Sequence, residues 1–217
     1  IVRRLVGSEM CIRDRGSRGV FPNISNWDTS SVTNMAQMFR DSKWNGAGNF
    51  TPSSSWDLSN ITSLALYLYN VIGIATLDWS NVTLSSSLTN MQQFMSRVTA
   101  TVSERVLTTV IFGANCDFSG VTTFASAFNS RTTLTRIEFD SSVSFASLTT
   151  ASNMGTGVPL LTTYYDQLLI RLDATNSLNS GVLTFNLANF TLGGLAETSR
   201  TQLITGQSWT ITDAGGV

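Results

Sequence analysis

The sequence contains no histidine, and it has only two cysteines and three prolines. Without histidine the chain lacks the side chain used most often as a general base and as a neutral metal ligand. A Ser-His-Asp or Cys-His catalytic site is therefore excluded. Cys11 and Cys116 could form one disulfide at most, which excludes a disulfide framework. We interpret Cys116 as a small buried apolar residue.

Charge and long apolar runs are also scarce. Asp, Glu, Lys and Arg make up 12% of the chain and leave a net charge of −1, whereas a share of roughly 25% is usual. A net charge this small produces only a weak electrostatic field. We therefore expect no nucleic-acid partner and no attraction to an anionic membrane. No stretch approaches the roughly 20 apolar residues of a membrane-spanning helix, so we expect no membrane insertion.

The first residues differ in character from the rest of the chain. Residues 6–15, VGSEMCIRDR, resemble the in-frame translation of a transposon-based sequencing-library adapter. They show no apolar periodicity and join abruptly to repeat-like sequence near Gly19. We therefore expect residues 1–18 to be a non-native or disordered segment, and the natural N-terminus to lie outside the sequence.

A short block then recurs along the chain. Val32-Thr-Asn-Met-Ala-Gln-Met-Phe39 has further copies that begin at Ile61, Leu88, Val121 and, more weakly, Leu148. The starts at 32, 61, 88, 121 and 148 are separated by 29, 27, 33 and 27 residues. A period in the high twenties, with small insertions, is typical of stacked repeat arrays.

The pattern inside and between the copies predicts two kinds of element. Apolar residues at i, i+3 and i+6 or i+7 predict short helices near 32–39, 61–69, 88–96, 121–129 and 148–154. Pieces of the form L-x-x-I-x-F at 74–79, 107–112 and 134–139 end with the alternation of a parallel strand that has one buried face. One repeat is therefore predicted to run strand, turn, Asp-led cap and short helix.

These elements predict an α/β repeat fold. Residues 19–155 are expected to form a solenoid of about five coils, each with one short parallel strand and one short helix. From about residue 156 the repeat stops, and a helix at 161–172, a strand at 182–187, a helix at 195–204 and a strand from 209 follow. We expect residues 156–217 to be a C-terminal α/β capping unit, which shields the last coil from water.

Three polar or aromatic positions recur in register with the copies. Asp28, Asp57 and Asp117 could form a cation ladder, but one carboxylate per copy falls far short of six to eight oxygen ligands. We interpret them as Asx-turn or cap residues. A threonine at the second position of each copy is expected to form hydrogen bonds near the helix start. Trp27, Trp56 and Cys116 each stand five residues before a copy, which predicts equivalent buried positions.

The segment Trp27-Asp-Thr-Ser-Ser-Val-Thr-Asn-Met-Ala-Gln-Met-Phe39 resembles the repeat of BspA-type leucine-rich-repeat surface proteins, a repeat also seen in mycoplasma surface lipoproteins. Residues 209–216, preceded by Tyr165 and Arg200, resemble the C-terminal end of such repeat tracts. The resemblance covers about residues 20–217, and the sequence departs from it at Trp79 and around 140–147.

The resemblance implies a right-handed leucine-rich-repeat solenoid with parallel strands on one face. It also implies a cell-surface or extracellular location and a role in adhesion or protein binding. The family carries no fixed ligand residues, so none can be transferred to this chain.

The outward positions of the L-x-x-I-x-F strands are the candidate binding face. These positions are Thr76, Asp78, Thr109, Arg136 and Glu138, and a plain solvated strand surface remains open for them. We expect a non-enzymatic monomer that binds a protein or glycan and holds no cofactor or metal. The alternative is a carbohydrate-binding or phage-tail-like appendage module of a larger secreted protein, which an exposed aromatic row would favour.

Deletion of residues 1–18 is expected to shift the melting temperature by no more than about 2 °C, because exposed chain ends make few contacts. Thermal unfolding followed by circular dichroism measures this shift. A decrease of about 10 °C would show instead that the segment packs on the first repeat.

Overall fold

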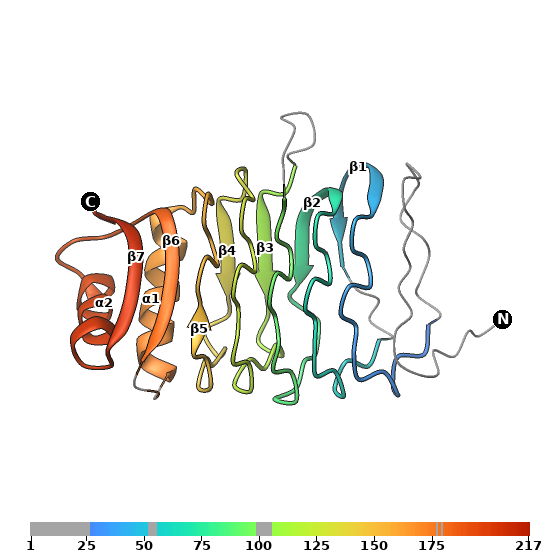
Figure 1. The fold of residues 1–217 in the computed structure, drawn as a ribbon, viewed down its shortest axis with the longest axis horizontal. Coiled ribbons are helices and arrows are strands. Elements are labelled where there is room, and N and C mark those ends of the chain that lie inside the picture. Colours follow the sequence, from blue (N-terminus) through green and yellow to red (C-terminus); the bar gives the residue numbers. More distant parts are fainter. Residues whose placement is uncertain (1–26, 52–55, 99–105, 177, 179) are drawn as a thin grey trace.

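A computed structural model describes residues 27–51, 56–98, 106–176, 178 and 180–217, without the side chains of 45–47. Successive passes of the chain lie side by side along one long axis, from β1 to β7 (Figure 1). The expected non-native segment 1–18 lies outside the described residues.

One side of this stack is a parallel sheet in the order β1–β2–β3–β4. Its strands are Lys43–Phe50, Ile72–Trp79, Thr109–Phe112 and Arg136–Phe139. The strands predicted at 74–79, 107–112 and 134–139 are confirmed as β2, β3 and β4. The sequence pattern does not predict β1, because residues 43–50 contain no L-x-x-I-x-F motif.

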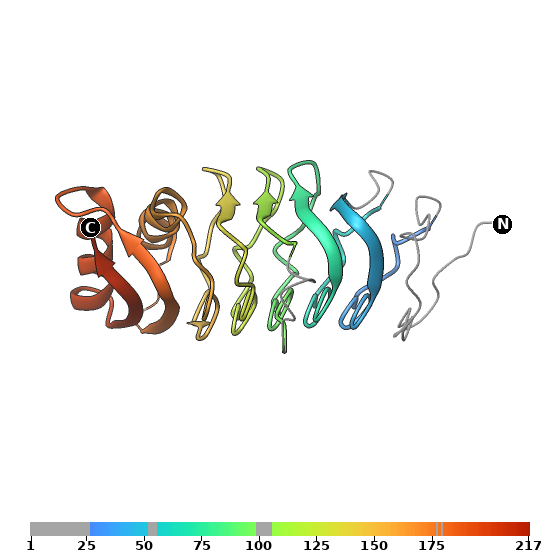
Figure 2. The same cartoon turned by 90° about the horizontal axis from the view of Figure 1, so that it is seen from above.

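A second parallel ladder runs the length of the described stack. It begins with single-residue bridges that link each copy to the next, between Asn34, Ser63, Asn90, Thr123 and Thr150. It continues through β5 (Thr150–Ala151), β6 (Gly181–Phe190) and β7 (Trp209–Gly216). In Figure 2, β3 and β4 lie along one side of the stack and β5 along the other.

The four elements predicted in the C-terminal unit are confirmed. They are α1 (Thr162–Thr175), β6, α2 (Leu195–Thr205) and β7. Thr150 pairs with Val182 of β6, which pairs with Thr210 of β7, so the second ladder passes from the repeats into this unit without interruption. Helix α1 lies on the side of β3 and β4 (Figure 2).

The five predicted short helices are wrong, because the described structure has no α-helix at any of these segments. Each segment is instead a run of β-turns. In the first copy the Met38 N–H donates to the Met35 carbonyl at 3.3 Å, which closes one turn. The Gln37 N–H between them donates to the Ala65 carbonyl of the next copy at 2.9 Å. Alternate N–H groups thus bond within a turn and across to the neighbouring copy.

A left-handed residue near the middle of each run explains why no helix forms. These residues are Gln37, Leu66, Gln93, Ser126 and Asn153, with φ between 53° and 63°. A right-handed helix cannot continue through positive φ. The apolar spacing could not distinguish a helix from a run of turns. In both structures the first and fourth residues of the copy point inward.

The recurring aspartates form Asx turns, as predicted. Oδ1 of Asp28, Asp57 and Asp117 accepts the N–H two residues later at 3.1, 2.9 and 2.8 Å. Their carboxylates therefore stabilise the turn that leads into each copy.

The recurring threonines bond between copies. The Thr62 hydroxyl donates to the Thr33 carbonyl at 2.9 Å. Thr89, Thr122 and Thr149 repeat this bond to the preceding threonine at 3.2, 3.2 and 3.0 Å. The prediction of hydrogen bonding is confirmed, although the bonds join neighbouring copies and not a helix start.

Aromatic rings from successive copies pack in the core. The Phe39 and Tyr67 ring centroids lie 5.2 Å apart, those of Tyr67 and Phe94 5.9 Å, and those of Phe94 and Phe128 6.4 Å. Such ring pairs contribute about 0.5–1.5 kcal/mol each beyond the burial of their area. The core is therefore continuous from copy to copy.

The predicted equivalence of Trp27, Trp56 and Cys116 is only partly right. Trp27 stacks on Trp56 at 6.1 Å, but Trp27 is only half-buried, whereas Trp56 is 8% exposed. Cys116 is buried as a free thiol, with its pKa raised to about 12 by burial. It bridges to Leu84, which bridges to Leu58, so it takes the register of Leu58 and not that of Trp56.

Buried Arg131 ties three copies together. Its guanidinium donates to the carbonyls of Met95 and Val71, the latter at 2.9 Å, and to that of Leu68 at 3.4 Å. Burial, and to a lesser extent the charge of Arg97, lowers the pKa of Arg131 to about 9. Arg131 therefore stays protonated at neutral pH.

Ser126→Gly is expected to leave the free energy of unfolding unchanged or to raise it by up to about 1 kcal/mol, because glycine adopts positive φ without steric cost. Ala125→Gly, at the neighbouring residue without positive φ, should lower it by roughly 0.5–1 kcal/mol. Urea unfolding of both variants measures the difference. An equal loss at both sites would indicate a helix and contradict the turn run.

Candidate functional site

The five residues of the predicted binding face lie together on β2, β3 and β4. Thr76 pairs with Thr109, which pairs with Arg136, so the three form one row across the sheet. Asp78 pairs with Ile111, which pairs with Glu138, and these form a second row. All these side chains are partly exposed.

The first row extends to β1. Asn49 pairs with Thr76 and is exposed. Sequence reasoning missed Asn49, because no motif marked its strand and only the pairing of β1 with β2 brings it into the row. Beneath the rows lie the buried side chains of Leu77, Val110 and Ile137, which fix the sheet on the core. The outward side chains thus rest on a rigid layer.

The two oppositely charged side chains on β4 of this face form an ion pair with each other. Arg136 Nε donates to Glu138 Oε2 at 2.9 Å, and its guanidinium lies 5.5 Å from the ring centre of Tyr164 in α1. The hydrogen bond to Glu138 is the main cause of a raised pKa at Arg136. Since the two side chains are 40% and 36% exposed, the pair contributes less than about 1 kcal/mol to stability. Both groups therefore remain available to a partner.

These side chains supply hydrogen-bond donors and acceptors of both charges. Asp78 Oδ1 accepts the Ser80 N–H at 3.0 Å, and the residue is partly exposed. Over the described ranges no three His, Cys, Asp or Glu side chains converge as metal ligands would. What the arrangement offers chemically is recognition by hydrogen bonds and charge.

The described surface shows aliphatic rather than aromatic exposure. Trp79 is fully buried and Trp56 nearly so. The large apolar side chains that are exposed in the described residues are Val98, Leu161, Val182, Leu187, Leu192, Leu195 and Val217. An aromatic platform of the kind that stacks on sugar rings is therefore not among these exposed side chains.

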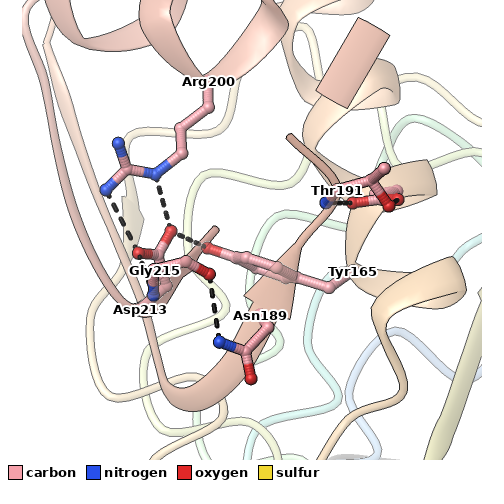
Figure 3. Close-up of polar contacts among 7 residues, drawn as sticks. Tyr165, Asn189, Thr191, Arg200, Asp213 and Gly215 are labelled. Carbon is pink, nitrogen blue, oxygen red and sulfur yellow. Dashed lines mark hydrogen bonds and ion pairs between the residues drawn. The ribbon is translucent and has the colours of Figure 1, made fainter. Parts of the chain in front are cut away.

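A polar cluster joins the two helices of the C-terminal unit to its last strand (Figure 3). Arg200 of α2 donates two hydrogen bonds to Asp213 of β7, at 2.7 and 3.1 Å. The Tyr165 hydroxyl of α1 donates to the same carboxylate at 2.9 Å. Asn189 of β6 donates to the Gly215 carbonyl at 3.1 Å.

The burial of this cluster indicates that it stabilises the fold. The side chain of Asp213 is 2% exposed, whereas that of Arg200 is 24% exposed. Burial first, and then the charge of Asp213, raises the pKa of Tyr165, so its hydroxyl remains a donor. Tyr165 and Asp213 are 48 residues apart, and no pattern in the sequence indicates that they meet. We therefore assign the cluster a structural role, which is to hold the helices and strands at the C-terminal end of the stack together.

Comparison with known families gives a match over part of the chain. Residues 17–106, less than half of the chain, match the family described as Mycoplasma protein of unknown function, DUF285. The chain is thus similar, over its first repeats, to a mycoplasma-type repeat family. Neither the curated proteins nor the solved structures give a match. No helix in the described residues is long and apolar enough to cross a membrane.

Arg200→Met is expected to lower the free energy of unfolding by about 3 kcal/mol, because it leaves the buried Asp213 carboxylate without its cation. Urea unfolding of the variant and of the parent measures the loss. Arg40→Met is the control, because its exposed pair with Asp41 is worth less than about 1 kcal/mol. Equal losses in the two variants would contradict a buried ion pair.

Proposed function

We propose that this chain is part of a non-enzymatic surface or secreted protein, a leucine-rich-repeat solenoid of the BspA type that binds another protein. Two findings support the family assignment. The repeat at Trp27–Phe39 resembles that family, and residues 17–106 match a mycoplasma-type family. The parallel ladders, which join each copy to the next, are the stacking that such an assignment requires.

The binding surface that we propose is the outward face of β2, β3 and β4. One observation carries this proposal: Thr76, Thr109 and Arg136 are aligned in one row, and Asp78 and Glu138 lie in the next. Polar side chains of both charges, held on a rigid sheet, suit a protein partner with complementary charge. The extended faces of repeat proteins serve as binding surfaces in this way.

A carbohydrate-binding or appendage module is the second candidate. Stacking on sugar rings would call for exposed aromatic side chains, and the exposed large apolar residues of the described chain are all aliphatic. The mixed-charge rows therefore favour a protein partner. Cell-surface or extracellular location and a monomeric state belong to the same proposal.

A charge reversal within the face tests this function. The double variant Arg136→Glu, Glu138→Arg keeps the net charge and the ion pair, and it should fold with a free energy of unfolding within about 1 kcal/mol of the parent. Binding to a panel of purified extracellular-matrix proteins, measured by surface plasmon resonance beside a glycan array, should be lost in the variant for any protein that the parent binds. The reason is that reversed charges face the partner's complementary ones.

Thr201→Glu with Gln202→Arg is the matched control. It places the same two charges on exposed positions of α2, away from the rows, and should leave binding intact. Binding to glycans that survives the reversal, with no protein bound by the parent, would replace the proposal with the carbohydrate candidate.

A further inference from the structure

The second ladder presents a face with different chemistry, which we call the hydroxyl face. It consists of the second, third, fifth and sixth residues of each copy. In the first copy these are Thr33, Asn34, Ala36 and Gln37. The threonines of its first row, Thr33, Thr62, Thr89, Thr122 and Thr149, are all exposed. The fourth residue of each copy, such as Met35, is buried in the core. The four residues of the face therefore lie on either side of a buried side chain.

This face carries neither charge nor aromatic rings. Four positions in each of five copies hold only Thr, Ser, Asn, Gln, Ala and one leucine, Leu66. The β2–β4 face, in contrast, holds Asp78, Arg136 and Glu138. A partner of the hydroxyl face must therefore be neutral, and it cannot depend on aromatic stacking.

The oxygen atoms of the face are held in place by hydrogen bonds. The hydroxyls of four threonines in the first row donate to the carbonyl of the preceding threonine, as Thr62 does to Thr33 at 2.9 Å. In the row formed by the third residue of each copy, Asn34 Oδ1 accepts the Ala36 N–H at 2.8 Å, and Asn90 Oδ1 accepts the Gln92 N–H at 2.9 Å. Because these rotamers are locked, a partner meets fixed oxygen positions at little entropic cost.

The positions repeat at the spacing of parallel strands, about 4.7–4.9 Å from copy to copy. The 33-residue interval between the third and fourth copies does not disturb this order, because Asn90 still bridges to Thr123. The order continues into the C-terminal unit, where Thr210 and Thr212 of β7 are exposed and in register with β6.

We infer that the hydroxyl face binds ice. The repeat of its oxygen atoms is close to that of water oxygens along the a-axis of hexagonal ice, and its rigid, neutral rows match a neutral lattice. Charged side chains would hold liquid-like hydration, and the face has none. A polysaccharide is the weaker match, because it would use aromatic rings. This inference is independent of the proposed protein binding, which uses the other side of the stack.

The test is partition into a slowly growing ice hemisphere, with thermal hysteresis measured on the same samples of the full chain. The parent should enter the ice and depress the freezing point below the melting point. Thr89→Lys with Thr122→Lys should abolish both effects, because two ammonium groups project from the first row. Thr83→Lys with Thr108→Lys is the control. Both threonines are exposed and outside the face, and Thr108 donates to the Ala75 carbonyl in the same manner, so this variant should retain both effects.

Thr89→Val with Thr122→Val guards against misfolding, because it keeps the shape and removes the oxygens. It should melt within a few degrees of the parent and partition less into ice. Exclusion of the parent from ice, with no thermal hysteresis, would overturn the inference. So would equal loss in the face and control variants, or binding to insoluble cellulose in place of ice. None of these results bears on the charge-reversal test of protein binding.

Discussion

The backbone hydrogen bonds between successive copies are the constraint on which the rest of the structure depends. In the threonine row of the hydroxyl face, the N–H groups of the four threonines after Thr33 donate to the preceding copy, as Thr62 does to the Thr33 carbonyl at 2.7 Å. A buried or half-buried N–H has to find an acceptor, and here the acceptor belongs to another copy. This choice fixes the register of both ladders, and it withdraws from each copy the donors that a helix would need. The left-handed residues at the middle of each turn run follow from the same choice.

Side chains reinforce that backbone pattern without replacing it. Aromatic rings such as Phe39, Tyr67 and Phe94 contact their counterparts in the next copy, so apolar burial acts along the same axis as the hydrogen bonds. Arg131 adds a long-range tie, because its fork of donors reaches carbonyls of two earlier copies. At the far end, Asp213 receives donors from both helices of the C-terminal unit and holds them against β7.

Because the register is strict, one residue type repeated in sequence becomes a row on the surface. The two sides of the stack acquire different chemistry in this way. The β2–β4 face collects Asp78, Arg136 and Glu138, whereas the second ladder collects hydroxyls and amides. The first kind of surface suits a partner with complementary charge. The second suits a neutral, ordered partner. Each row is therefore a consequence of pairing, and its length depends on how many copies contribute to it.

The sequence by itself determined the repeat period, the inward apolar positions, the strands β2 to β4, the Asx turns at Asp28, Asp57 and Asp117, and the helices and strands of the C-terminal unit. Each of these depends on local spacing, which decides whether a side chain points inward. Tertiary structure alone decided that the copies are turn runs, that Cys116 shares the register of Leu58, that Asn49 joins the outward row, and that Tyr165 meets Asp213. The physical reason is that an apolar residue at every third or fourth position is compatible with more than one backbone path. The path is selected by the acceptors that the N–H groups find, and in the turn runs of this protein every other acceptor lies about 30 residues away in the neighbouring copy.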